Sequence, residues 1–108
     1  MPSNLQTFTY TLLTGSSSVT GTAIDPEKST LNTVYYLMSG ASASSQITFV
    51  VEARDPVGNW GYVVDYVQLT GSRVNSISTF NTPITNGLRG SIQNISNASG
   101  SIYLDSSY

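Results

Sequence analysis

The chain has 108 residues, with four Lys and Arg against six Asp and Glu and a formal net charge of −2. Charged residues make up only 9% of it, where about 25% is usual for soluble domains, and hydroxyl side chains take their place, with 18 Ser and 13 Thr. Four scattered cations cannot form the basic stripe that neutralises a row of phosphates, so we expect no nucleic-acid partner. The length predicts one domain over residues 1–108.

Several residue types that hold cofactors, and the segments that enter membranes, are missing. The chain contains no Cys and no His, which excludes a disulfide framework and a zinc site built on thiolate or imidazole. The longest uninterrupted apolar run, Val34 to Met38, is far below the roughly 20 residues that span a bilayer, and the N-terminus has no basic or apolar signal segment. We therefore expect no cofactor, no metal and no membrane partner.

Apolar residues recur at every second position through most of the chain, which is the period of a β-strand. Asp25 and Glu27 flank Pro26 in a predicted turn, and we favour this turn over a calcium site because calcium needs further oxygen ligands. The pattern predicts three strands before the centre of the chain: Leu5–Leu13, Val19–Ile24 and Leu31–Met38.

The central segment, residues 46–67, gives the clearest hairpin signal. Asp55-Pro56-Val57-Gly58 places Asp, Pro and Gly where a type I turn prefers them, so the chain is predicted to reverse there. Because the returning strand has one large, apolar face, we expect that face to belong to the core. Alternation assigns four residues to it: Trp60, Tyr62, Val64 and Tyr66.

The last third of the chain is predicted to add the strands Val74–Phe80, Leu88–Ile95 and Ser101–Asp105, the last two forming a hairpin across Ser96–Gly100. No segment shows a helical apolar stripe, and β-branched and hydroxyl residues dominate. Regularly spaced turn signals favour an antiparallel arrangement. The sequence thus predicts an all-β fold, an antiparallel β-sandwich of about eight short strands with jelly-roll or related Greek-key topology.

The titratable residues offer little basis for catalysis. His is absent and Lys28 lies in a charged turn, so the many Ser and Thr lack a plausible general base. Glu52, Asp55 and Asp65 could supply the paired carboxylates of a glycosidase, but we favour a solvated hairpin face with a local ion pair to Arg54. We expect no catalytic residue and no enzyme activity.

The composition favours a binding or structural protein. Ser, Thr and Asn lose little side-chain entropy when a contact orders them, while Lys and Glu, which are depleted at interfaces, total only three. Arg89 lies between Leu88 and Gly90 on a late predicted strand. A paired, half-buried role for it is favoured over a partner contact.

Four short motifs lie between roughly residues 45 and 105: Ile47–Asp55 (ITFVVEARD), Gly58-Asn59-Trp60, Leu88-Arg89 and Gly100–Leu104 (GSIYL). Together they resemble the small β-sandwich virion proteins of tailed bacteriophages. In that family, an alternating strand ends in an acidic turn with Gly and Trp. A later strand with Arg is followed by a final strand that begins with Gly. The resemblance implies a capsid cement, or decoration, protein.

Such a protein binds the outside of an assembled head, commonly as a homotrimer, and bridges copies of the major capsid protein. The resemblance therefore implies a virion protein on the outer capsid surface, synthesised in the host cytoplasm. Residues 1–6 are interpreted either as an arm that lies on a neighbour or as a frayed terminus. The expected partner contacts are Asn4, Leu5, Gln6, Asn59, Trp60 and Arg89.

The alternative function comes from a different class, the receptor- or carbohydrate-binding modules of phage tail fibres and cell surfaces. The same sandwich would then use Tyr35, Tyr36 or Trp60, exposed on its surface, to stack against a sugar ring. This alternative predicts binding to soluble glycans, whereas a cement protein binds assembled heads.

Overall fold

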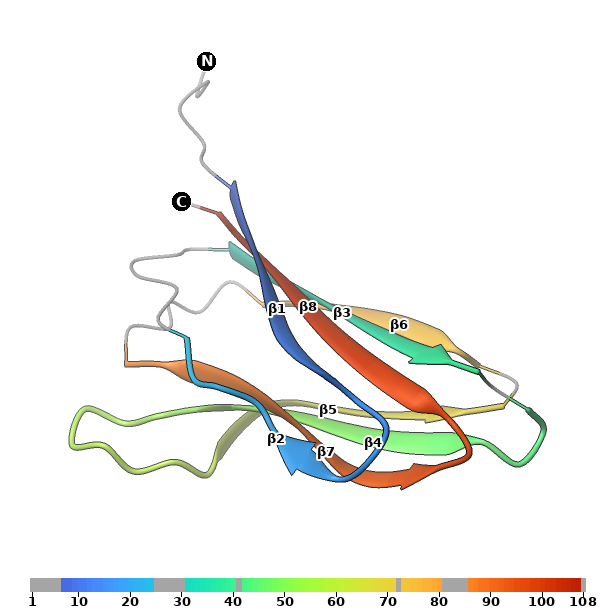
Figure 1. Ribbon diagram of the computed structural model, residues 1–108. Coiled ribbons are helices and arrows are strands. Elements are labelled where there is room, and N and C mark those ends of the chain that lie inside the picture. The colour runs from blue at the N-terminus through green and yellow to red at the C-terminus, as the bar shows by residue number, and fades with distance from the viewer. Residues whose placement is uncertain (1–6, 25–30, 41, 72, 81–85, 108) are drawn as a thin grey trace, which may run out of the picture.

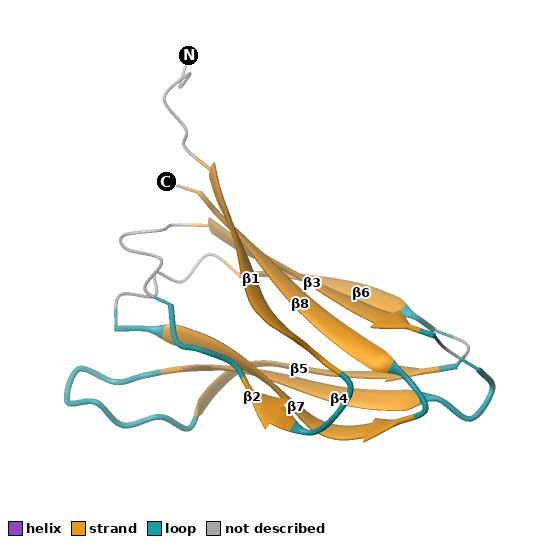
Figure 2. Ribbon diagram, in the orientation of Figure 1, coloured by secondary structure: helices purple, strands orange, loops and turns teal. Residues whose placement is uncertain are grey.

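The computed structural model describes residues 7–24, 31–40, 42–71, 73–80 and 86–107. These residues form eight strands and no helix (Figure 1, Figure 2). Within these ranges, nothing helical is long and apolar enough to cross a membrane. In chain order the strands are β1 (Thr7–Gly15), β2 (Val19–Thr20), β3 (Leu31–Ser39), β4 (Gln46–Ala53), β5 (Tyr62–Thr70), β6 (Asn75–Phe80), β7 (Leu88–Ser96) and β8 (Ser99–Ser107).

The strands form two four-stranded antiparallel sheets that face each other (Figure 1). The first sheet has the order β1-β8-β3-β6, and the second sheet has the order β2-β7-β4-β5. Consecutive strands alternate between the sheets, except for the β4–β5 pair, and this arrangement of two Greek keys is a jelly roll. The predicted all-β antiparallel sandwich is confirmed.

The core lies between the sheets and follows from the period of two. On β3 every second residue from Asn32 to Met38 is buried. Tyr36 of the first sheet and Phe49 of the second meet with ring centroids 5.3 Å apart. Fully burying an aliphatic or Phe side chain contributes about 1.5–3 kcal/mol. The buried apolar cluster comprises Leu12, Val34, Tyr36, Met38, Ile47, Phe49, Val51, Leu69, Leu88, Ile92, Ile102 and Leu104.

The β4–β5 hairpin forms where the turn signal places it. Gly58 donates its backbone N–H to the carbonyl of Asp55 at 3.1 Å, which closes the predicted four-residue turn. The φ angle of Gly58 is 100°, in the left-handed region that favours glycine. The predicted reversal between residues 46 and 67 is confirmed.

The inner face of β5 differs from the predicted one. Leu69 is fully buried and Val67 packs against the core, so the inner face follows the odd-numbered positions there. Tyr66 and Tyr62 are 60% and 55% exposed, and the prediction that they lie in the core is wrong. The β4–β5 pairing shifts register at Val64, which packs against the core as predicted. Tyr66 lies on the outer side because the bulge at Val64 changes which positions of the strand face inward after it.

The strands β7 and β8 lie in different sheets. β7 pairs with β2 and β4, whereas β8 pairs with β1 and β3, so the predicted hairpin between them is wrong. The chain crosses between the sheets at Asn97 and Ala98. Asn97 has a φ angle of 53°, a conformation that Asn tolerates better than most residues, and its carbonyl accepts a hydrogen bond from Ser45 Oγ at 2.6 Å. Turn residues signal that the chain changes direction, but they do not specify which sheet receives the next strand.

Candidate interaction surfaces

Two charged side chains pair on the outer face of the second sheet. Glu52 on β4 lies directly opposite Arg89 on β7, and both Nε and Nη2 of Arg89 lie 2.5 Å from Glu52 Oε1. Side-chain exposures of 16% for Glu52 and 29% for Arg89 mark the half-buried, paired role expected of Arg89. The expected ion pair to Arg54 is wrong: Glu52 pairs with Arg89, while Arg54 Nε donates to the carbonyl of Asn86 at 2.7 Å.

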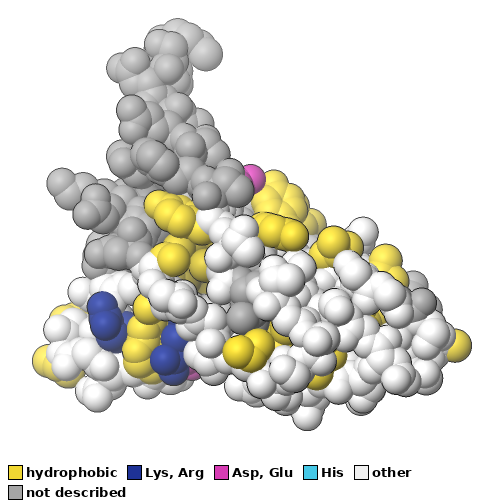
Figure 3. Space-filling view, in the orientation of Figure 1, with side chains coloured by type: hydrophobic (Ala, Val, Ile, Leu, Met, Phe, Trp, Pro, Cys, Tyr) yellow, Lys and Arg dark blue, Asp and Glu magenta, His cyan; other side chains and the backbone are white. Residues whose placement is uncertain are grey.

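Trp60 is contacted by two guanidinium groups. The Cζ atoms of Arg89 and Arg54 lie 4.2 and 5.4 Å from the centroid of its ring, within the roughly 6 Å reach of a cation–π interaction. Trp60 is half-buried in this arrangement, not in the core as predicted. We call Glu52, Arg54, Trp60 and Arg89 the Trp60 cluster. Figure 3 shows dark-blue basic atoms flanking hydrophobic atoms at one end of a face that is otherwise mostly white.

Asp55 organises the turn beside the Trp60 cluster. Its Oδ1 accepts the backbone N–H groups of Asn59 and Val57 at 2.8 and 3.0 Å, and its Oδ2 accepts the Tyr62 hydroxyl at 2.9 Å. The backbone hydrogen bond from Asn59 is the main cause that lowers the pKa of Asp55, and the same carboxylate raises the pKa of Tyr62. Asp55 therefore holds the loop that presents the exposed Asn59.

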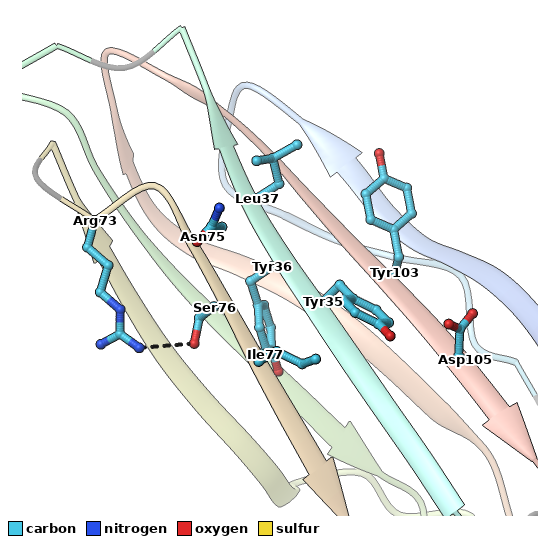
Figure 4. Close-up of a pocket in the computed structure, with 9 residues that line it drawn as sticks. All are labelled: Tyr35, Tyr36, Leu37, Arg73, Asn75, Ser76, Ile77, Tyr103 and Asp105. Atoms are coloured by element: carbon cyan, nitrogen blue, oxygen red, sulfur yellow. Dashed lines mark hydrogen bonds between the residues drawn. The ribbon is translucent and has the colours of Figure 1, made fainter.

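The outer face of the first sheet carries a second group of residues, of which only Tyr35 is expected from the sequence as a ligand contact. Tyr35 on β3 lies opposite Tyr103 on β8 and opposite Ile77 on β6. Tyr35 is 39% exposed and Ile77 is 60% exposed. With their neighbours they line a hollow of about 780 Å³ (Figure 4). Its lining residues are Tyr35, Tyr36, Leu37, Arg73, Asn75, Ser76, Ile77, Tyr103 and Asp105.

Tyr36 does not offer its ring to a ligand. It is 1% exposed, and its hydroxyl donates to Asp65 Oδ2 at 2.5 Å. Burial is the main cause that raises the pKa of Tyr36, and the hydrogen bond and charge of Asp65 add to it. Of the tyrosines expected to be exposed for sugar stacking, only Tyr35 is exposed, and the expectation for Tyr36 is wrong.

The remaining predicted site residues lie outside the described part of the chain. These are Asn4, Leu5 and Gln6 of the proposed arm, Lys28, and the Asp25–Glu27 turn. Within the described ranges, no group of three or more acidic side chains could hold a metal ion. Of the predicted partner contacts, the structure therefore brings together Asn59, Trp60 and Arg89 at one end of the second sheet.

The fold is shared with proteins of known structure. No protein-family model matches the chain, and no curated protein matches it. Its fold is similar to the crystal structure of the SPBc2 prophage-derived protein YomS, with 14% sequence identity, a TM-score of 0.69, and coverage of 96% of this chain and 95% of that chain. It is also similar to a structure of infectious bursal disease virus, Gx strain, with 15% identity, a TM-score of 0.52, and coverage of 95% and 33%.

A third similar structure is the Yersinia pseudotuberculosis-derived mitogen, with 16% identity, a TM-score of 0.50, and coverage of 96% of this chain and 84% of that chain. The three proteins thus include one of prophage origin, one from a virus and one from a bacterium. At these identities the likeness establishes the β-sandwich fold alone.

Proposed function

We propose that this chain is a structural protein of a virus or bacteriophage particle and acts by contact with other protein subunits. The Trp60 cluster is the observation that carries the proposal. Trp and Arg, together with Tyr, are the side chains enriched among residues that dominate binding energy at protein interfaces. Here a half-buried Trp is flanked by two Arg at the end of a sheet, beside the exposed Asn59.

The pairing within the cluster suits an interface. Arg89 is already fixed by Glu52, so ordering its long side chain at a contact costs little further entropy. The surrounding surface is rich in Ser, Thr and Asn, and only three Lys and Glu occur in the chain. Jelly-roll domains also occur in viral capsids, and the likeness to a prophage-derived protein is compatible with this role.

The finer proposal is a cement, or decoration, protein on the outside of the head. A homotrimer would bridge neighbouring copies of the major capsid protein, and effective concentration would turn modest contacts of each copy into firm attachment. A standard patch of about 800 Å² is roughly one seventh of the accessible surface of 5985 Å², so one copy has room for trimer and capsid contacts.

The test is a titration of heads that lack this chain, prepared from the phage or virus that encodes it after deletion of its gene. Purified protein is added, and the copies bound per head are counted by quantitative mass spectrometry. We expect saturation at hundreds of copies, and light scattering is expected to give three times the chain mass of 11.5 kDa. Trp60→Ala should weaken binding about 30-fold, because a dominant interface residue contributes about 2 kcal/mol or more.

Arg54→Ala provides a second variant that leaves the Glu52–Arg89 pair in place, and it should also weaken binding. Ile77→Ala is the matched control, because Ile77 is 60% exposed but lies on the other sheet. Saturation at only a few copies per particle would contradict the cement role and favour a neck or tail position. Failure to bind any part of the particle would contradict the structural role as a whole.

A further inference from the structure

The hollow on the first sheet lies outside the proposed particle contact. We propose that this hollow, over β3, β6 and β8, binds a neutral oligosaccharide. The inference does not depend on the proposed function, because the Trp60 cluster lies on the outer face of the other sheet.

The first support is a paired aromatic surface. Tyr35 and Tyr103 are direct cross-strand partners, and Ile77 extends their row on the other side of β3. Directly opposite residues in a sheet have Cβ atoms about 5 Å apart, so these side chains form one continuous surface. Figure 4 shows the ring of Tyr35 extending from β3 toward β8. A pyranose ring presents a face of C–H groups, which matches such a surface in shape and polarity.

The second support is the set of polar groups around the rings. The hollow is lined by the Asp105 carboxylate, the Asn75 amide and the two tyrosine hydroxyls, which together can both donate and accept hydrogen bonds. A sugar needs this combination, because its ring edge carries hydroxyls that act as both donors and acceptors. A few placed polar groups in a mainly apolar hollow are typical of small-ligand sites.

The charge arrangement favours a neutral ligand. Asp105 lies beside Tyr35, whereas Arg73 lies on the far side of β6 from the rings (Figure 4). Arg73 Nη2 donates to Ser76 Oγ at 3.3 Å, which directs the guanidinium along β6. Of the two charged side chains that line the hollow, Asp105 is therefore the one on the side of the rings, where an acidic sugar would meet a like charge.

The size of the hollow sets the length of the ligand. Two strand spacings separate β8 from β6, which is about 10 Å, and the row of paired residues runs across all three strands. The volume of about 780 Å³ falls within the range of about 300–1,000 Å³ that is usual for ligand sites. A di- or trisaccharide lying across the strands fits these dimensions.

A second copy of this chain is the competing occupant of the same face. Interfaces between copies pack as densely as protein interiors, and a flat sheet laid on this surface would leave the hollow unfilled. The Asn75 amide at the rim would also lose water to an apolar partner without gaining hydrogen bonds. An oligosaccharide fills the hollow and bonds to this amide.

The test uses the purified full chain and an array of neutral oligosaccharides of glucose, galactose, mannose and N-acetylglucosamine, together with sialylated versions of the galactose-terminated members. Affinity for the best ligand is then measured by titration calorimetry. We expect Tyr35→Ala and Tyr103→Ala to lose about tenfold or more in affinity, because each removes one stacking surface. Tyr103→Phe should keep most of the affinity. Tyr66→Ala, which removes an exposed tyrosine from the other sheet, should leave affinity unchanged.

Thermal melting confirms that each variant is folded, and Asp105→Asn provides a milder variant that removes only the charge. Asp105→Asn should reduce the ratio between the affinity for neutral ligands and the affinity for their sialylated versions. The proposal is overturned if no neutral oligosaccharide binds, if sialylated ligands bind more tightly than their neutral parents, or if Tyr66→Ala weakens binding as much as Tyr103→Ala. It is also overturned if wild-type oligomers dissociate in Tyr103→Ala, since a second copy would then cover the face. None of these results depends on whether the chain binds heads.

Discussion

Tyr36 contributes both to core packing and to a hydrogen bond between the two sheets. Its ring packs 5.3 Å from that of Phe49, while its hydroxyl donates to Asp65 at the inner face of β5. Burial, more than the neighbouring carboxylate, raises the pKa of Tyr36 far above its ordinary value of 10.0. The folded protein therefore keeps this hydroxyl protonated at pH values where the unfolded chain would ionise it.

This difference predicts a pH dependence of stability. Because the pKa is raised in the folded state, the stabilisation is complete below pH 10 and is lost as the pH rises above it. We expect this group to lower the free energy of unfolding by about 1.4 kcal/mol per pH unit in that range. Tyr36→Phe should remove that part of the slope. At neutral pH the substitution should cost about 1–3 kcal/mol, because Asp65 loses a buried donor.

Urea denaturation of wild type and Tyr36→Phe, at several pH values on both sides of 10, measures this effect. Tyr66→Phe is the control, because it removes a hydroxyl from a tyrosine that is 60% exposed. An alkaline slope in Tyr36→Phe equal to that of wild type would contradict the account.

At the scale of elements, sequence predicts what is local and misses what depends on long-range pairing. The β4–β5 hairpin is predictable because Asp55, Pro56 and Gly58 encode its turn within four residues. The partners of β7 and β8 are not encoded by the short connection between them, because a jelly roll brings β8 between β1 and β3. Alternation alone does not give the inner face of β5, because a bulge at Val64 interrupts the period of two.

For the two candidate surfaces too, sequence predicts local contacts but not contacts that depend on strand pairing. Asn59 and Trp60 are predictable as neighbours in one turn, whereas the pairing of Glu52 with Arg89 requires the register between β4 and β7. Alternation around the buried Ile102 and Leu104 already places Tyr103 on an outer face. No local signal places it beside Tyr35, since that contact arises only when β8 enters the first sheet.

At Gly100, β8 packs closely against side chains of β4 in the opposite sheet. A Cβ at this position would lie 2.9 Å from Phe49 Cε1 and 3.0 Å from Ile47 Cδ1, both of which belong to the buried core. Gly100→Val should therefore destabilise the protein by about 1–3 kcal/mol through overpacking, measured by urea denaturation. Ser99→Val, at the adjacent exposed position of β8, is the control for β-propensity. Equal stability of the two variants would mean that the Phe49 and Ile47 side chains move aside at little cost.

At the scale of the whole molecule, the Trp60 cluster and the hollow lie on opposite outer faces of the sandwich. Glu52 and Arg89 alternate with core residues and so lie on the outer side of the second sheet. Tyr35 and Tyr103 lie on the outer side of the first sheet. The core separates the two surfaces, and the effects of substitutions at distant sites without shared partners usually add. A protein attached through one surface would therefore present the other to solvent.

This geometry predicts that attachment to a particle leaves the hollow accessible. Heads carrying the wild-type protein should bind the neutral oligosaccharide selected by the array, while heads without the protein should not. Tyr103→Ala should attach to heads normally but fail to capture the oligosaccharide. Trp60→Ala should bind the oligosaccharide in solution but carry less of it to heads at the same protein concentration, because its affinity for heads is about 30-fold lower. Loss of both activities in each folded variant would show that the surfaces are coupled, and would contradict an arrangement in which one sheet faces the particle and the other faces solvent.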